Sequence, residues 1–177
     1  MSGPFGSSQW MYNPSTSFYS HTINQSLRFG DGDVGYLSRT FGTPTDSNKW
    51  TLSLWVKSCR NQVRFLDVGG SAGNDDLIGI GSPGYEQVYF NKRTSSSYDY
   101  RLQTTQLLRD PSAWYHCVTV FDSSNSTSSD RQIIYINGER VTALDYSSYP
   151  SSGAASRINT AVEHRIGTTV YSSSFDN

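Results

Sequence analysis

The sequence predicts an all-β protein built as an antiparallel β-sandwich. Short runs rich in β-branched and aromatic residues recur along most of the chain, separated by Gly, Ser, Asn and Asp. No segment shows ten or more residues of helical period with capping residues at its ends. The run at 114–121 is apolar on both of its alternating faces, which is typical of an inner strand that is covered on both sides.

The clearest pair of strands is a long antiparallel hairpin over residues 114–141. Its arms cover 114–121 and 131–136, and the connector at 122–130 holds only the short polar residues of a surface loop. Asn137 and Gly138 then supply two residues that tolerate positive φ. They predict a tight type I′ turn into a further strand at 139–144.

Further strands are expected on both sides of this hairpin. They are predicted at 27–29, 35–40, 48–57, 63–68, 77–80, 87–91, 98–104 and 164–170. Residues 69–76 are predicted as a loop, 92–97 as a polar turn, and 145–157 as a long loop of Ser, Gly and Pro.

The chain divides into an arm at 1–25 and a single domain at 26–177, which is long enough to bury a core. The arm has no clear period but carries several aromatic residues, Trp10 and Tyr12 among them. A free disordered tail has few aromatics, so we expect the arm to pack. The arm could pack either on the sheet edge of its own domain or on a neighbouring subunit.

Composition excludes several classes of partner. The 14 Lys and Arg residues balance the 15 Asp and Glu, and no basic run stands out, which argues against nucleic acid. No apolar stretch approaches a membrane span, and the N-terminus lacks the pattern of a signal peptide. The two cysteines, Cys59 and Cys117, exclude a disulfide framework; a buried free thiol is favoured over a single bridge.

Three stretches carry a resemblance to a known family. TLSLWVK at 51–57, AWYHCVTVFD at 113–122 and IIYINGERVT at 133–142 resemble the concanavalin A-like, laminin-G-like jelly rolls. SLRFGDGDVGYLSRT at 26–40 and FGSSQWMY at 5–12 are similar to the version found in tail and structural proteins of marine bacteriophages. The family's closing C-terminal strand begins with a Phe-Asp-Gly motif, which Phe175, Asp176 and Asn177 match only in part, so this strand is expected to be missing.

The resemblance implies a non-enzymatic virion protein, either capsid decoration or tail-associated, assembled in the host cytoplasm. Its partners would be other virion proteins, and a homo-oligomer is expected. The position of the absent strand would be filled by another chain or by the arm before Ser26. The alternative is a carbohydrate-binding module that recognises a host surface glycan.

An enzyme is not expected. Glycosidases of this architecture need a pair of carboxylates across the sugar bond. The chain has only Glu86, Glu139 and Glu163, and none has an acidic neighbour at alternate positions. A Ser-His-Asp triad is not excluded by composition, but His116 is better explained as a structural residue with a core hydrogen bond.

The resemblance makes calcium the best cofactor candidate, because related laminin-G-like and lectin domains often hold one at a loop rim. Calcium binds several oxygen ligands, including carboxylates. Asp31 and Asp33 form one candidate pair, and Asp75 and Asp76 another. The competing interpretation is that these residues only form turns.

Tyrosines in predicted loops are candidates for contacts with a glycan or with a protein partner. Aromatic rings stack on sugar faces, and a tyrosine-rich surface of low charge also suits protein contacts. The candidate contact residues are Trp10, Tyr12, Tyr85, Tyr98, Tyr146 and Tyr149.

Overall fold

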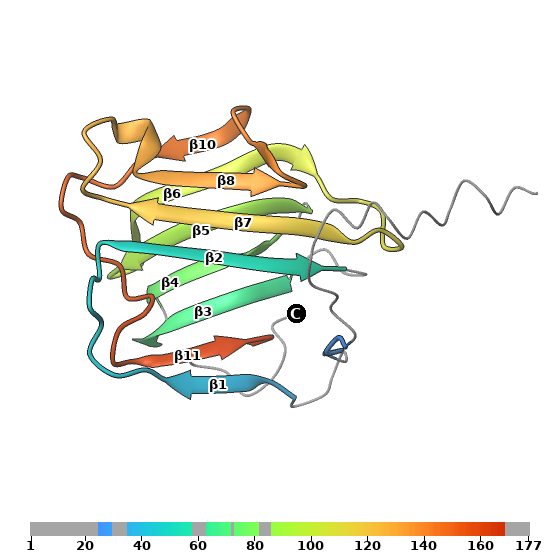
Figure 1. The fold of residues 1–177 in the computed structure, drawn as a ribbon, viewed down its shortest axis with the longest axis horizontal. Helices are drawn as coiled ribbons and strands as arrows, with labels where there is room; N and C mark the ends of the chain where they lie inside the picture. Colours follow the sequence, from blue (N-terminus) through green and yellow to red (C-terminus); the bar gives the residue numbers. More distant parts are fainter. Residues whose placement is uncertain (1–24, 30–34, 58–62, 72, 82–85, 169–177) are drawn as a thin grey trace, which may run out of the picture.

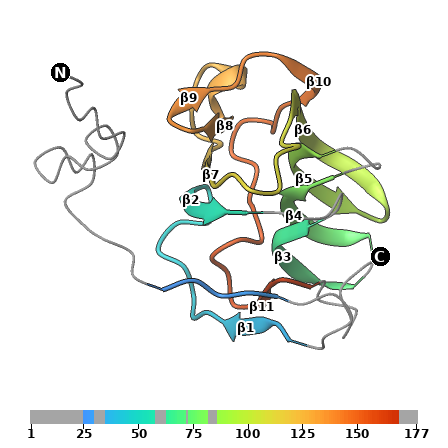
Figure 2. The same cartoon turned by 90° about the vertical axis from the view of Figure 1, so that its right-hand side faces the viewer.

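The protein forms a sandwich of two antiparallel sheets (Figures 1 and 2). The structure, a computed structural model, describes residues 25–29, 35–57, 63–71, 73–81 and 86–168. The large sheet has seven strands in the order β1-β11-β3-β4-β5-β6-β10, and the small sheet has four in the order β2-β7-β8-β9. The prediction of an all-β antiparallel sandwich is confirmed.

The strands of the large sheet are β1 (Leu37–Thr40), β11 (Glu163–Ile166), β3 (Val63–Ser71), β4 (Asn74–Ile80), β5 (Gln87–Thr94), β6 (Ser97–Leu107) and β10 (Leu144–Ser148). Those of the small sheet are β2 (Lys49–Val56), β7 (Tyr115–Asp122), β8 (Gln132–Ile136) and β9 (Glu139–Arg140). A 3₁₀ turn, Ser128–Asp130, lies in the loop between β7 and β8.

The core lies between the two sheets and is rich in aromatic residues. Phe90 and Tyr100 from the large sheet meet Phe121 from the small sheet, and all three are almost fully buried. Trp50 stacks on Phe121 with the ring centroids 5.6 Å apart. Successive side chains of a strand point to opposite faces of the sheet, so the residues that alternate with these rings point away from the core.

The predicted hairpin is confirmed as β7 and β8, with Val118 opposite Tyr135. Asn137 and Gly138 adopt the positive φ values of 52° and 88° that the turn requires. Cys117 is a buried free thiol whose pKa burial raises to about 12. Cys59 lies outside the described residues.

Several predicted boundaries are wrong. Residues 27–29 form no strand. The predicted loop at 69–76 is a tight hairpin, because β3 continues to Ser71 and β4 begins at Asn74. The predicted turn at 92–97 is also shorter: β5 runs on to Thr94, and two serines adopt positive φ in the turn.

The predicted strand at 139–144 is two strands in different sheets. β9 ends at Arg140 and stays in the small sheet, whereas β10 begins at Leu144 and pairs with β6 in the large sheet. The chain then runs from β10 to β11 along one end of the sandwich (Figure 1). Part of the stretch predicted as a loop at 145–157 is therefore strand.

The position beside the last described strand is filled from within the domain. β11 pairs with β3 on one side and with β1 on the other. β1 begins at Leu37, so the neighbour of β11 is neither the arm before Ser26 nor another chain, the two partners that were predicted for this position. Residues 1–24 and Phe175, Asp176 and Asn177 lie outside the described part of the chain. No helix within the described ranges is long and apolar enough to span a membrane.

Candidate functional site

The outer face of the large sheet is polar and yet largely buried. Residues of this face lie opposite one another on neighbouring strands: Leu77 on β4 is opposite Asn91 on β5, and Asn91 is opposite Arg101 on β6. Asn91 is 2% exposed and Arg101 is 9% exposed. Polar residues at this depth are rare unless they are paired, so this face is a candidate site.

Two exposed tyrosines enclose Arg101 at the β6–β10 edge of this face. The Arg101 guanidinium carbon lies 4.0 Å from the centroid of the Tyr146 ring and 4.7 Å from that of Tyr98. The two rings are 52% and 44% exposed. Such cation–π contacts hold the rings in fixed orientations. We call Tyr98, Arg101 and Tyr146 the tyrosine–arginine cluster.

A chain of hydrogen bonds leads away from the cluster. Arg101 donates through Nη2 to the Gln103 amide oxygen, and the Gln103 amide nitrogen donates to Gln87. Gln87 in turn donates to the carboxylate of Asp145, which is exposed on β10. The amide of each glutamine accepts one hydrogen bond through its oxygen and donates the next through its nitrogen. This continuous chain fixes Arg101, Gln103 and Gln87 relative to one another.

Two buried atoms beside the cluster have no hydrogen-bond partner in the described structure. They are the Nε of Arg101, a donor, and the Oδ1 of Asn91, an acceptor. These residues lie directly opposite each other on β6 and β5. Thr119 Oγ1, Ser123 Oγ and Gln132 Oε1 among the described residues are buried in the same state, so the pair is not unusual in this fold.

The structure brings together two of the six predicted contact residues. Tyr98 and Tyr146 meet at Arg101, as described above. Tyr149 packs against the core instead. Trp10, Tyr12 and Tyr85 lie outside the described residues.

The predicted metal ligands Asp75 and Asp76 do not form one site. They are neighbours on β4, so their side chains point to opposite faces of the sheet. Arg93 binds the Asp75 carboxylate with two nitrogens, Nε reaching Oδ1 at 2.7 Å. Asp76 Oδ2 accepts from Ser156 Oγ at 2.7 Å and from the Arg157 backbone at 2.8 Å, and Arg157 Nη1 lies 3.1 Å from Oδ1.

These carboxylates are committed to the fold, so the Asp75–Asp76 pair does not fit a calcium site. Burial raises the pKa of Asp76, and the hydrogen bonds from Ser156 and Arg157 oppose that rise. Within the described ranges, no group of three or more His, Cys, Asp or Glu residues could hold a metal ion. Asp31 and Asp33 lie outside those ranges, so calcium binding there stays a prediction.

The prediction that His116 makes a core hydrogen bond is wrong. Its neighbours on β7 that face the core are Cys117 and Thr119, so His116 lies on the outer face of the small sheet. Its Nε2 is 2.9 Å from Ser53 Oγ, and its ring stacks on Trp55 with the centroids 4.9 Å apart. The alternation in the sequence was apolar on both faces and therefore did not show which face is buried.

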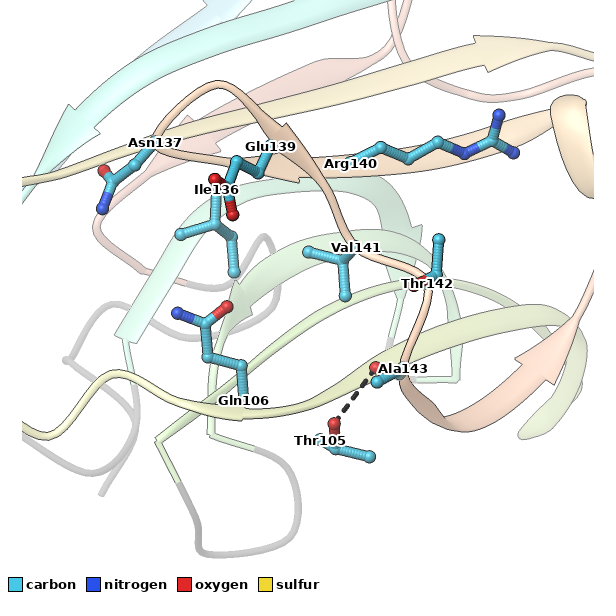
Figure 3. A pocket seen from close by; sticks show the side chains of 9 residues that line it. All are labelled: Thr105, Gln106, Ile136, Asn137, Glu139, Arg140, Val141, Thr142 and Ala143. Atoms are coloured by element: carbon cyan, nitrogen blue, oxygen red, sulfur yellow. Dashed lines mark hydrogen bonds between the residues drawn. The ribbon is translucent and has the colours of Figure 1, made fainter.

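A shallow cavity of about 260 Å³ lies at the other end of β6 (Figure 3). Its wall is closed where the Thr105 backbone and hydroxyl both donate to the Ala143 carbonyl. Figure 3 shows the Gln106 amide and the Glu139 carboxylate turned toward this space, while Arg140 extends away. Gln106 and Glu139 are both exposed, so the cavity lacks the buried polar groups that orient a ligand.

Sequence reasoning missed the residues at the centre of the site. Arg101, Asn91 and Gln103 lie inside strands, where a polar residue is usually assigned to the solvent side. The signal that could have located them is the run YDYRLQT at 98–104, in which Arg101 and Gln103 alternate with Tyr100 and Leu102. That alternation separates a polar face from an apolar face.

Comparison with known proteins places the fold in context. The family model described as the concanavalin A-like lectin/glucanases superfamily matches residues 30–175. Among solved structures, mouse laminin alpha1 chain, domains LG4-5, is similar with a TM-score of 0.52 and 11% sequence identity. The similarity covers 83% of this chain but only 36% of that one. A search of curated proteins found no match. Neither match names a bacteriophage or a virion protein.

Proposed function

We propose, from the premise that this chain belongs to the concanavalin A-like lectin/glucanase superfamily, that it is a non-enzymatic module that binds a saccharide. The observation that carries the proposal is the tyrosine–arginine cluster, in which two exposed rings are fixed against one nearly buried guanidinium. A rigid aromatic surface suits a sugar ring, because binding does not have to order the protein side chains first.

The chemistry around the cluster supports this ligand class. Each tyrosine offers an apolar ring to the C–H faces of a sugar and a hydroxyl to its polar edge. Gln103 and Gln87 lie in the adjoining hydrogen-bond chain, and Asp145 adds an exposed carboxylate that accepts from sugar hydroxyls. A few fixed polar groups beside aromatic rings are typical of small-ligand sites.

A glycan array with the wild-type chain tests the proposal, followed by titration calorimetry on any glycan that binds. Tyr146→Ala is expected to weaken binding at least tenfold while changing stability little, because the Tyr146 side chain is half exposed. Trp114→Ala is the matched control, since Trp114 is 49% exposed but precedes β7 of the small sheet. Equal binding by the Tyr146→Ala variant, or no glycan bound by the wild type, would contradict the proposal.

A second candidate is contact between subunits in a particle, as the resemblance to virion proteins implied. Leu37 and Ile166 favour it: they are cross-strand partners at the β1 edge of the large sheet, and they are 46% and 40% exposed. An exposed apolar sheet edge is suited to pairing with another chain. Sedimentation tests this candidate: a concentration-dependent oligomer that Leu37→Lys dissociates would support it, and a monomer at all concentrations would contradict it.

A further inference from the structure

We infer that residues 169–177 of this chain dock on the outer face of the large sheet, where they cross the strands from β3 toward the tyrosine–arginine cluster. These nine residues follow the last described residue, Thr168, and lie outside the described part of the chain. The inference goes beyond the proposed function and does not depend on it, because it concerns what covers this face and not which ligand the cluster binds.

The outer face buries two apolar side chains that do not belong to the core. Leu77 and Tyr89 are each 4% exposed, but neither is part of the core cluster between the sheets. Their strand neighbours Ile78 and Phe90 are core residues, so Leu77 and Tyr89 point to the outer face. The small sheet packs on the opposite face of these strands and cannot cover them (Figure 2).

This burial requires a cover that the described residues do not supply. Within the described ranges, the connections run at the ends of the sandwich or on the side of the small sheet, and none crosses the outer face (Figure 2). A tyrosine and a leucine on a bare sheet face would be exposed to water. Burial also raises the pKa of the Tyr89 hydroxyl to about 12, as expected where water is excluded. The cover therefore comes from a part of the chain outside those ranges.

The way in which the chain leaves β11 favours residues 169–177 as this cover. The Gly167 backbone donates to the Arg64 carbonyl of β3 at 3.3 Å. Gly167 has a φ of 90°, a value that favours glycine and that turns the chain out of the strand. The next residue, Thr168, is only 2% exposed, so the chain leaves β11 against the protein and not into solvent.

Arg64 begins a row of cross-strand partners that leads to the cluster. Arg64 is opposite Gly79, and Gly79 is opposite Tyr89. Tyr89 is opposite Gln103, and Gln103 is opposite Tyr146. A Cβ atom at Gly79 would lie 2.8 Å from the Tyr89 hydroxyl, so the Tyr89 ring lies across β4 and does not stand off the sheet. A chain that follows this row crosses the buried Tyr89 and ends beside the cluster.

Nine residues are enough to follow the row. Neighbouring strands lie about 4.8 Å apart, so the four steps from β3 through β4, β5 and β6 to β10 cover about 19 Å. Nine extended residues span at most about 30 Å.

The arm at 1–24 is the competing candidate for the cover. It joins the domain at Gln25, and Figure 2 shows the segment 25–29, in blue, extending at the bottom of the sandwich toward the side of the small sheet. The arm thus starts on the side opposite to the outer face. The segment 169–177 starts at the row itself, so it is the better occupant.

The sequence of the segment suits a chain that lies on an apolar surface. In an extended chain, Tyr171 and Phe175 point to one side, and Ser172 and Ser174 point to the other. Tyr171 is three residues beyond Thr168, about 10 Å of extended chain, which is the distance from β3 to β5, where Tyr89 lies. The two aromatic residues therefore face the sheet, and the serines face water.

Hydroxyl-radical footprinting of the full chain, read by mass spectrometry, tests the inference. In the double variant Tyr171→Lys/Phe175→Lys, we expect oxidation of Tyr89 to rise about fivefold, because its ring passes from buried to exposed. Oxidation of the core residues Phe90 and Phe121 should stay at the wild-type level and shows that the domain is folded. Unchanged oxidation of Tyr89 would overturn the inference.

The matched control is Ser172→Lys/Ser174→Lys. It adds the same two charges to the same segment, but on the side that faces water, so Tyr89 should stay protected as in the wild type. A rise in Tyr89 oxidation equal to that of the aromatic double variant would show that Tyr171 and Phe175 do not anchor the segment, and it would overturn the inference.

A spin label gives a second measurement that leaves both aromatic residues in place, so it decides the inference even if the double variant is unstable. The label is attached at Asp176→Cys in a Cys59→Ser background, since Cys117 is buried. It should broaden the amide NMR signals of Gln103 and Tyr146, at the far end of the row. No broadening on the large sheet would overturn the inference.

Two comparisons separate this occupant from the others. A label in the arm, at Ser8→Cys, should leave the Gln103 and Tyr146 signals unchanged; broadening by this label in place of the one at position 176 would make the arm the cover. Labelled chains mixed with isotope-enriched unlabelled chains should show no broadening. Broadening in the mixture would make a second copy the donor of the segment. Either result would overturn the inference and leave the proposed function intact.

Discussion

The buried polar residues of the large sheet fall into two groups that differ in their hydrogen-bond partners. At the β4 side, Asp75 and Asp76 are each bound by an arginine, and their carboxylate oxygens are engaged by donors from other parts of the chain. On the neighbouring strands, Asn91 and Arg101 are also buried, but each keeps a buried polar atom unpaired. The difference separates carboxylates whose oxygens are all engaged from polar residues that each keep a buried atom without a partner.

The satisfied region has an evident structural task. Ser156 and Arg157 belong to the segment that runs from β10 to β11, and both bind Asp76. The same segment is held further along by His164, whose Nε2 accepts from the Asn159 backbone at 2.9 Å. Figure 1 shows this segment passing down one end of the sandwich, and its residues 149–162 form no strand. Asp76 therefore adds to the backbone hydrogen bonds that tie this segment to the rest of the chain, which Gly153 donates to Ser123 and Ser156 donates to Ser47.

The largest expected effect follows from removing Asp76. Asp76→Ala leaves Arg157 and Ser156 without their acceptor in a buried position, and we expect the free energy of unfolding to fall by about 3 kcal/mol. Urea unfolding measures this loss. Asp99→Ala is the control: Asp99 forms a partly exposed ion pair with Lys92 at 3.7 Å and should cost less than about 1 kcal/mol. Equal losses in both variants would contradict a special role for Asp76.

A smaller loss is expected at Asp75. Asp75→Asn keeps the shape of the side chain but replaces one of the two acceptors of Arg93 with an amide nitrogen, which repels the guanidinium. We expect a loss of about 2 kcal/mol in urea unfolding, the usual scale of a hydrogen bond to a charged group. The melting temperature of both Asp75→Asn and wild type should be insensitive to added calcium at this site. A calcium-dependent rise that Asp75→Asn abolishes would show that Asp75 is a ligand after all.

The strands were predictable because their pattern is local. Alternation of apolar residues and the Asn137–Gly138 turn are properties of neighbouring residues, and they located β2, β7 and β8 correctly. The split between β9 and β10 was not predictable in the same way. A strand that leaves one sheet and joins the other changes its partners, but its own pattern of side chains stays the same.

The site was predictable only in part, for a related reason. Tyr98 and Tyr146 were identified as candidates, but 48 positions along the chain separate them, and only the pairing of β6 with β10 brings them together. For Asp75 and Asp76 the sequence suggested a shared site that the fold does not form. Adjacent acidic residues suggest one site in a loop, but in a strand they point to opposite faces, and nothing in the local sequence showed that the strand begins at Asn74.

A pH effect is expected from His164 in the satisfied region. Burial lowers the pKa of His164 below its ordinary value of 6.5, while the Val162 carbonyl and Asp76 oppose that shift. The folded state therefore keeps the ring neutral, whereas the unfolded chain takes up a proton as the pH falls below about 6.5. Stability should be at its full value above that pH and should fall as the pH decreases toward 5. Urea unfolding at pH 7.5 and at pH 5.5 measures the change.

His164→Gln is the matched variant for the pH effect. The glutamine amide oxygen can accept from the Asn159 backbone at any pH, so the difference in stability between the two pH values should be smaller than in the wild type. His21 and His116 are unchanged in the variant, and their contribution cancels in the comparison. An identical pH dependence in both proteins would show that His164 does not cause it.

The smallest expected effect has the opposite sign and lies at Asn91. Asn91→Leu replaces a buried amide that has an unpaired oxygen with an apolar side chain of similar size, next to Leu77 on β4. Removing an unsatisfied polar group should raise the free energy of unfolding by about 1 kcal/mol. Gln132→Leu is the informative contrast: Gln132 is 1% exposed and also has an unpaired oxygen, but its amide nitrogen donates to the Phe90 carbonyl at 2.9 Å. That substitution removes a working hydrogen bond and should destabilise the chain. If Asn91→Leu were destabilising as well, Asn91 would belong with Asp75 and Asp76 among the residues that hold the sheet together, and the distinction between the two regions would disappear.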